Sequence, residues 1–151
     1  MDTLNFPAYR FDLKNRENKP YIFDQIRKKW VLLQPEEWVR QHCISYLIES
    51  KAYPKSMINV EKKVLINGQS KRYDVIVYQS SGRPFLLIEC KAPSISISQS
   101  SFDQIARYNL VLNSQYLMVT NGLNHYFCQM NMAEQRYTFI PELPPYSNKT
   151  T

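Results

Sequence analysis

Two runs of strand-forming residues joined by a short polar turn are the feature that most constrains how this chain can fold. The first run, Tyr73–Tyr78, is rich in β-branched and aromatic residues, and the second, Phe85–Ile88, is entirely apolar. The segment between them, residues 79–84, contains a Ser-Gly pair. Two such runs around such a turn predict an antiparallel β-hairpin.

The apolar run ends at Glu89-Cys90-Lys91, which places charge directly beside a core segment. Because side chains alternate along a strand, Glu89 and Lys91 are expected on one face and Cys90 on the other. If the hairpin closes symmetrically about its Ser-Gly pair, Asp74 lies directly opposite Glu89, with Cβ atoms about 5 Å apart. A bulge at Gly82 would instead shift the register and separate the two acids.

Facing carboxylates destabilise a sheet unless something compensates their charge. A divalent cation held between Asp74 and Glu89 would turn this repulsion into a binding site, and carboxylate oxygens suit Mg²⁺ or Mn²⁺. The alternative is a solvated strand face on which Glu89 and Lys91 form a weak ion pair.

A helix is expected before the hairpin, over about 35–50. Pro35 suits its first turn, Glu36 and Glu37 complement the helix dipole, and an apolar stripe follows. Dipole complementation is by itself a sufficient explanation of the two acids.

A second helix is expected after the hairpin, over about 101–113. Gln104 and Tyr108 stand four residues apart, so they share one side of it. A pair of this kind is also typical of the boundary between core and solvent.

The charge balance favours a nucleic-acid partner. The chain has 19 Lys and Arg against 13 Asp and Glu, a formal charge of +6 and a pI near 9.2, which attracts phosphate backbones. Basic clusters lie at 27–29, at 62–63 and at Lys71-Arg72, with aromatic residues nearby. Each cluster alone is also consistent with a solvated face. No segment resembles a sequence-reading helix, so backbone contacts are expected to dominate.

These residues together resemble the PD-(D/E)XK nuclease superfamily, and most closely the N-terminal nuclease domain of type I restriction enzyme R (HsdR-like) subunits. The resemblance covers roughly residues 34–122. Its most specific phrases are Pro35-Glu36-Glu37-Trp38-Val39-Arg40, Lys71-Arg72-Tyr73-Asp74 and Leu87-Ile88-Glu89-Cys90-Lys91-Ala92-Pro93. One departure is that Tyr73 stands where the superfamily's name-giving proline precedes the acid.

The resemblance implies a role for each candidate residue. Asp74 and Glu89 would be metal ligands and Lys91 the catalytic lysine. Glu36 would be the helix acid, with Glu37 as a substitute. The Gln104-x-x-x-Tyr108 motif would support the site and contact DNA, and the basic pair Lys71 and Arg72 is a further candidate for nucleic-acid binding.

Phosphodiester hydrolysis gives these residue types a chemical reason. A Mg²⁺ ion held by one or two carboxylates polarises the phosphate and lowers the pKa of a bound water. Lys91 could orient or deprotonate that water, or neutralise the transition state as a point charge. Gln104 could fix the Glu89 carboxylate or a metal-bound water through a hydrogen bond.

Other classes of site are excluded by residue type and spacing. Three glycines, Gly68, Gly82 and Gly122, cannot build a Walker A loop or a dinucleotide fingerprint. Three separated cysteines without a Cys-x-x-Cys motif argue against a zinc site or a disulfide framework and suit a reducing cytoplasm. No signal peptide or membrane span is expected, so we predict a cytoplasmic protein.

We therefore expect an α/β fold, a restriction-endonuclease-like mixed sheet flanked by helices, with core order αβββαβ and an N-terminal β-hairpin. The expected parts are an N-terminal β extension over 1–33, a nuclease-like domain over 34–140 and a flexible tail over 141–151. Further strands are expected at 116–120, 125–130 and 136–140.

The favoured function is a Mg²⁺-dependent nuclease that hydrolyses DNA in restriction, repair or defence against foreign DNA. The alternative is a catalytically silent nucleic-acid-binding or partner-docking module within a larger complex. Expected partners are DNA, with RNA left open, and a motor or specificity subunit in trans. Homodimer formation and the endo- or exonucleolytic mode are left open.

Overall fold

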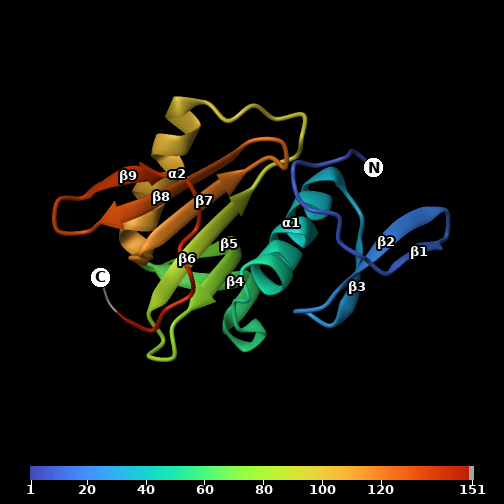
Figure 1. Ribbon diagram of the computed structural model, residues 1–151, viewed down its shortest axis with the longest axis horizontal. Helices are drawn as coiled ribbons and strands as arrows, with labels where there is room; N and C mark the ends of the chain where they lie inside the picture. The colour runs from blue at the N-terminus through green and yellow to red at the C-terminus, as the bar shows by residue number, and fades with distance from the viewer. Residues whose placement is uncertain (150–151) are drawn as a thin grey trace.

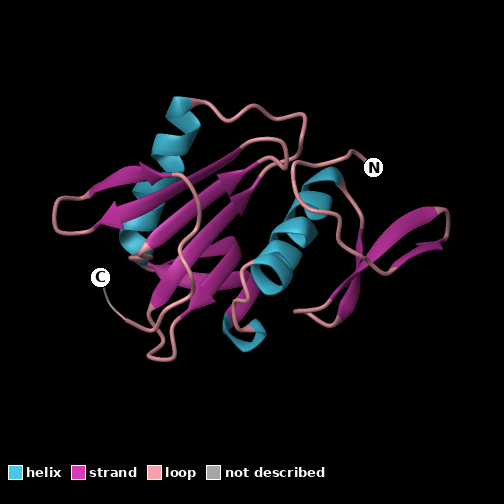
Figure 2. Ribbon diagram, viewed as in Figure 1, coloured by secondary structure: helices cyan, strands magenta, loops and turns pink. Residues whose placement is uncertain are grey.

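A six-stranded sheet with one helix on each face forms the body of the protein (Figures 1 and 2). The computed structural model describes residues 1–149, except for the side chain of Ile66. The strands follow the order β4-β5-β6-β7-β8-β9, and neighbours are antiparallel except for β6 and β7, which are parallel. They are β4 (Ile58–Ile66), β5 (Gln69–Tyr78), β6 (Pro84–Cys90), β7 (Tyr116–Thr120), β8 (His125–Asn131) and β9 (Arg136–Ile140).

Both predicted helices are present. Helix α1 (Pro35–Ser45) begins with proline and continues as a π-helical turn (Tyr46–Ser50). Helix α2 (Gln99–Leu112) is the crossover between the parallel strands β6 and β7. The Ser98 hydroxyl caps its first turn, and Asn113 ends it in the left-handed conformation with φ 65°. Within residues 1–149, no helix is long and apolar enough to cross a membrane.

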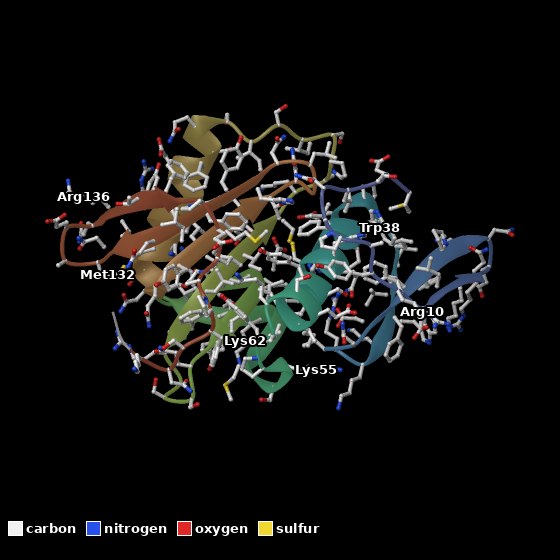
Figure 3. All side chains as sticks on the ribbon, in the orientation of Figure 1. Arg10, Trp38, Lys55, Lys62, Met132 and Arg136 are labelled. Atoms are coloured by element: carbon white, nitrogen blue, oxygen red, sulfur yellow. The ribbon has the colours of Figure 1, made fainter. Side chains whose placement is uncertain are left out.

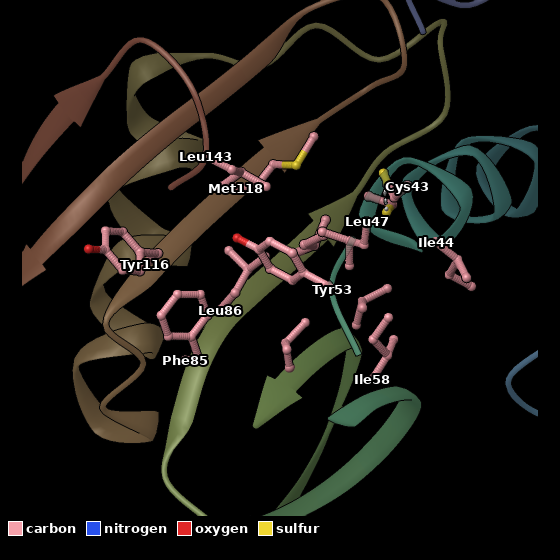
Figure 4. Packing of buried hydrophobic residues seen from close by; sticks show 14 of the residues in the cluster. Cys43, Ile44, Leu47, Tyr53, Ile58, Phe85, Leu86, Tyr116, Met118 and Leu143 are labelled. Carbon is pink, nitrogen blue, oxygen red and sulfur yellow. Dashed lines mark hydrogen bonds between the residues drawn. The ribbon is translucent and has the colours of Figure 1, made fainter. Parts of the chain in front are cut away.

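Alternation along the strands divides the core into two layers. Val75 and Ile88 point toward α1, whereas Ile76 and Leu87 point toward α2. Figure 4 shows the α1 layer, where side chains from the helix and the sheet meet. Helix α1 contributes Val39, Cys43 and Ile44, followed by Leu47 from the π-helical turn, to this layer, and α2 contributes Phe102, Ala106 and Leu112 to the other.

The hairpin of β5 and β6 has the register expected for symmetric closure along its core. Val75 pairs with Ile88, and the next two pairs toward the turn keep this register. Near the turn the register shifts, because Val77 pairs with Leu86 and the next residue, Tyr78, pairs with Pro84, which leaves Phe85 of β6 as the extra residue. The bulge therefore lies on β6 at the turn end of the hairpin, away from the acids, and the register beside them is the expected one.

The N-terminal segment forms a separate three-stranded antiparallel sheet rather than the expected hairpin alone. Its strands are β1 (Leu13–Arg16), β2 (Lys19–Asp24) and β3 (Lys29–Leu32), in that order. The sheet projects from the body next to α1 (Figure 1). The buried Asp24 fixes it there, because its carboxylate accepts hydrogen bonds from Arg27 and, at 2.9 Å, from Gln41 of α1.

The chain after β9 lies packed against the body, which differs from the expected flexible tail. Leu143 is buried in the α1 layer, and the Tyr53 hydroxyl donates to the carbonyl of Pro144 at 2.6 Å. The Tyr146 hydroxyl donates to the carbonyl of Tyr78 at 2.9 Å. Proline-rich composition thus marks an irregular segment here, and buried apolar side chains hold it in place. Residues 150–151 lie outside the described part.

Candidate active site

Asp74 and Glu89 come together where β5 and β6 separate. The regular ladder ends with Val75 opposite Ile88, so Asp74 and Glu89 occupy the next position along the two strands. Beyond that pair, the backbone N–H of Cys90 donates to Asp74 Oδ2 at 2.8 Å, in place of a further ladder bond. The side chain of Asp74 thus bridges β5 and β6 beyond the last regular backbone pair.

Burial and the neighbouring carboxylate make Glu89 unusually hard to ionise. Burial raises the pKa of Glu89 to about 8, with further contributions from the charge of Asp74 and from a hydrogen bond between the two carboxyl groups. Lys71 and Lys91 act in the opposite direction on this pKa. The pair therefore retains a proton near neutral pH unless another cation lies against it.

Alternation places Lys91 on the same side of β6 as Glu89. Cys90 points the other way, into the α1 layer, where its sulfur lies 3.8 Å from that of Cys43. The backbone N–H of Lys91 donates to the carbonyl of Thr120 at 2.8 Å, which holds the end of β6 against β7. The Lys91 ammonium and the Glu89 carboxyl group therefore lie on the same side of the end of β6, which β7 holds in place.

Arg40 of α1 is a central site residue that sequence reasoning missed. It is almost fully buried, and its guanidinium contacts three carboxylates: Asp74 at 3.0 Å, Glu61 at 2.8 Å and Glu37 at 3.1 Å. Although burial disfavours the charge, Glu37 and Asp74 raise the pKa of Arg40 above its usual value. Its spacing of three residues from Glu37 was a signal for an ion pair. The participation of Glu61, from β4, had no signal in the sequence.

The structure assigns different surroundings to the two helix acids. Glu37 is held in ion pairs with Arg27, at 2.8 Å, and with Arg40. Glu36 keeps much of its surface in solvent, but partial desolvation of its carboxyl group and then the charge of Asp74 raise its pKa, whereas Arg40 and Lys91 lower it. Glu36 therefore faces the Asp74 site, and Glu37 belongs to the network that supports it.

Helix α2 approaches the site through Lys71. The Lys71 ammonium lies 3.4 Å from the centroid of the Tyr108 ring, and its charge also acts on Glu89. Gln104 and Tyr108 line a shallow groove along α2, and no hydrogen bond in the described structure joins Gln104 to Glu89. Arg72 is exposed and pairs weakly with Glu61 at 3.4 Å.

The chemistry of the donor set fits a hard divalent cation. Asp74 and Glu89 supply carboxylate oxygens, and Mg²⁺ commonly uses only one or two carboxylates while it keeps several waters. Burial is the main cause of the raised pKa of Glu89, and a cation bound against the pair would lower this pKa. Over residues 1–149, however, no group of three or more His, Cys, Asp or Glu side chains is arranged around one metal position.

Comparison with known families decides where this protein belongs. Residues 35–144 match the family model described as the type I restriction enzyme R protein N terminus. The chain belongs to this family. No curated protein matches it. The region shared with the type I restriction enzyme R protein N terminus begins at α1 and contains all the site residues named above except Arg27, whereas the sheet of β1, β2 and β3 lies outside it.

Proposed function

We propose that this protein is a Mg²⁺-dependent nuclease of the restriction-endonuclease type that hydrolyses phosphodiester bonds of DNA. The observation that carries the proposal is the contact between the Asp74 and Glu89 carboxyl groups, beside Lys91, where β5 and β6 separate. Membership of the R protein family supports it, as does the element order α1, β4, β5, β6, α2, β7. The family also supports DNA and a motor or specificity subunit as partners.

A bound Mg²⁺ would polarise a phosphate oxygen and lower the pKa of a coordinated water. Asp74 and Glu89 would hold it, and Arg40 and the backbone N–H of Cys90 keep the Asp74 carboxylate in one orientation. Arg40 thereby also limits the number of negative charges that the site presents. Gln104 and Glu36 would hydrogen-bond to the acids or to waters at the open side of the site.

Lys91 would act on the reacting phosphate. As the water oxygen forms a bond to phosphorus and the bond to the leaving sugar oxygen breaks, negative charge builds on the phosphate oxygens, and a fixed ammonium stabilises it. The water gives up a proton and the leaving oxygen takes one up. Lys71, Arg72 and Tyr108 would hold the flanking backbone, Lys71 from its position over the Tyr108 ring.

Cleavage assays test this proposal directly. The full chain, incubated with plasmid or single-stranded DNA and Mg²⁺ or Mn²⁺, should nick or degrade it. Lys91→Ala should slow cleavage by roughly 10² to 10³ because transition-state charge loses its partner. Asp74→Asn and Glu89→Gln should do the same through loss of the cation. Undiminished cleavage by all three variants would identify a contaminant and overturn the proposal.

Matched controls separate the site from general charge effects. Glu142→Gln and Lys55→Ala change an acid and a base that are exposed and far from the Asp74 site in the chain. Both should cleave at the wild-type rate. Thermal unfolding of every variant checks that its fold is retained.

A binding module without turnover is the second candidate function. It is favoured by Asp74, because both of its carboxylate oxygens already accept hydrogen bonds, from Arg40 and from Cys90. If the wild type and Lys91→Ala bind DNA equally and neither cleaves DNA or RNA with either metal, this candidate replaces the nuclease.

A further inference from the structure

The outward face of the small N-terminal sheet carries an arrangement that the acidic site does not use. In β2, Ile22 and Asp24 point inward and are buried, so the alternate residues point to solvent. Pairing across the sheet then brings seven side chains onto one surface, which we call the outer face. Its members are Lys14, Arg16, Lys19, Tyr21, Phe23, Trp30 and Leu32.

Aromatic rings occupy the centre of the outer face. Phe23 lies directly opposite Trp30, and their ring centroids are 5.4 Å apart at an interplanar angle of 71°. Trp30 and Leu32 are each 37% exposed, which leaves large apolar side chains open to solvent at the centre of this face. The Lys14 ammonium lies 4.2 Å from the centroid of the Trp30 ring. An exposed cation of this kind is easily displaced.

Cations surround these rings. Lys14 lies opposite Tyr21, and Arg16 lies opposite Lys19 in the next row outward. Arg10 lies beside the sheet, at the opposite end of the molecule from Arg136 (Figure 3). Of the nearby acids, Asp24 points inward and is paired with Arg27, and Glu17 lies in the turn between β1 and β2. Asp12 lies opposite Phe23, whose N–H donates to the Asp12 carbonyl at 3.0 Å, so one acid on this face stands against Lys14, Arg16 and Lys19. The outer face is therefore positive as well as aromatic.

We propose that the outer face binds single-stranded DNA. Bases would stack on Trp30 and Phe23, and Lys14, Arg16 and Lys19 would contact the phosphates. Stacking suits an unpaired strand, because every base has a free ring face that a duplex keeps covered. A stacked base outweighs the exposed contact between Lys14 and Trp30, so the ammonium can move to a phosphate.

This binding face goes beyond the proposed cleavage and does not depend on it. The sheet lies outside the region shared with the R protein family, and it is joined to the acidic site by ion pairs that run from Asp24 through Arg27 and Glu37 to Arg40. DNA bound to the outer face would therefore be held at a fixed position relative to α1. Its binding can be measured in EDTA, where a metal-dependent nuclease is silent.

Tryptophan fluorescence provides a local readout. The chain contains two tryptophans, so Trp38→Phe leaves Trp30 as the reporter. Oligothymidylate of about 12 nucleotides, added in EDTA at low salt, should quench this fluorescence. The same quenching should occur when Lys91→Ala is added to the background. Unchanged fluorescence at saturating oligonucleotide would overturn the proposal.

Anisotropy of a labelled oligothymidylate tests the residues themselves. Trp30→Ala should weaken binding by about tenfold, whereas Phe139→Ala, which removes an exposed ring on β9, should not. The double variant Lys14→Gln, Arg16→Gln changes only exposed side chains. It should make the slope of log affinity against log salt concentration shallower by about one unit for each cation removed. The control Arg136→Ala, at an exposed arginine on β9, should leave this slope unchanged. Equal affinity of the wild type and all outer-face variants would contradict the proposal. A change of Trp30 fluorescence on addition of anionic lipid vesicles, with no change on addition of DNA, would also contradict the proposal.

Discussion

Glu89 shows how one side chain links burial, charge and chemistry. It follows the apolar run of β6, and burial together with Asp74 raises its pKa to about 8. A carboxyl group whose pKa is raised on folding binds its proton more tightly in the folded state. Its contribution to stability is therefore complete below its ordinary pKa near 4.5 and is lost as the pH rises through about 8.

Because the pKa of Glu89 is raised on folding, the stability of the protein should fall as the pH rises. Without divalent cations, the wild type should lose stability between pH 5 and pH 8, and Glu89→Gln, which mimics the protonated acid, should not. At pH 8 we expect the variant to be more stable by about 2 to 4 kcal/mol. Thermal unfolding in EDTA at the two pH values measures this difference.

Two comparisons sharpen the Glu89 experiment. Glu142→Gln, at an exposed acid, should follow the wild-type pH profile. Mg²⁺ at pH 8 should raise the melting temperature of the wild type and leave Glu89→Gln unchanged, since a ligand that binds only the folded state stabilises it. A wild-type stability that is the same at both pH values would contradict the assignment of Glu89.

Arg40 connects three elements through one buried guanidinium. It is part of α1, and it contacts Glu61 of β4 and Asp74 of β5 as well as Glu37 one turn away. The strand ladder between β4 and β5 is interrupted at this level, where Glu61 adopts a left-handed conformation with φ 56°. At this level the ion pairs of Arg40 with Glu61 and Asp74 therefore connect β4 and β5 in place of a backbone pair.

Removal of this guanidinium should be costly. Arg40→Met should destabilise the fold by about 3 to 5 kcal/mol, because several buried carboxylates lose their partner at once. Arg72→Met removes an ion pair whose arginine is 55% exposed and should cost less than about 1 kcal/mol. Urea unfolding at pH 7 measures both. A loss of similar size in the two variants would show that Arg40 has no special role.

At the scale of the whole molecule, the last residues close the α1 side of the core. Leu143 is 1% exposed and joins side chains from α1, β6 and β7 in one cluster, as Figure 4 shows for its labelled members. Gln79, in the hairpin turn, donates to the carbonyls of Ser147 and Lys149 at 3.0 Å and 3.1 Å. The C-terminal segment thus supports the hairpin that carries the acids.

A core substitution tests this role of the C-terminal segment. Leu143→Ala should lower the free energy of unfolding by about 2 to 5 kcal/mol, as expected for a buried leucine in a filled core. Leu65→Ala, at a leucine that is 74% exposed, should change it by no more than about 0.5 kcal/mol. Urea unfolding compares them. A negligible effect of Leu143→Ala would mean that the segment is loosely attached.

The sequence by itself determined the features that depend on neighbours along the chain. Alternation and the polar turn predicted the hairpin, and periodicity predicted both helices. The pairs from Val75 to Val77 have the register expected for symmetric closure, although the pairing next to the turn is shifted by one residue. The strands at 116–120 and 136–140 were predicted with the bounds that the structure has. Strands, turns and helices of this kind follow from the conformational preferences of consecutive residues, which a sequence shows directly.

The tertiary structure alone decided which distant charges meet. Arg40 lies on α1, Glu61 on β4 and Asp74 on β5, and only the packing of α1 on the sheet brings the three side chains together. The same packing brought Glu36 near Asp74 and Glu37 into an ion pair with Arg40, and it buried Leu143 in a segment whose composition predicted flexibility. Charge compensation and burial depend on the whole three-dimensional surroundings of a side chain, which no window of neighbouring residues contains.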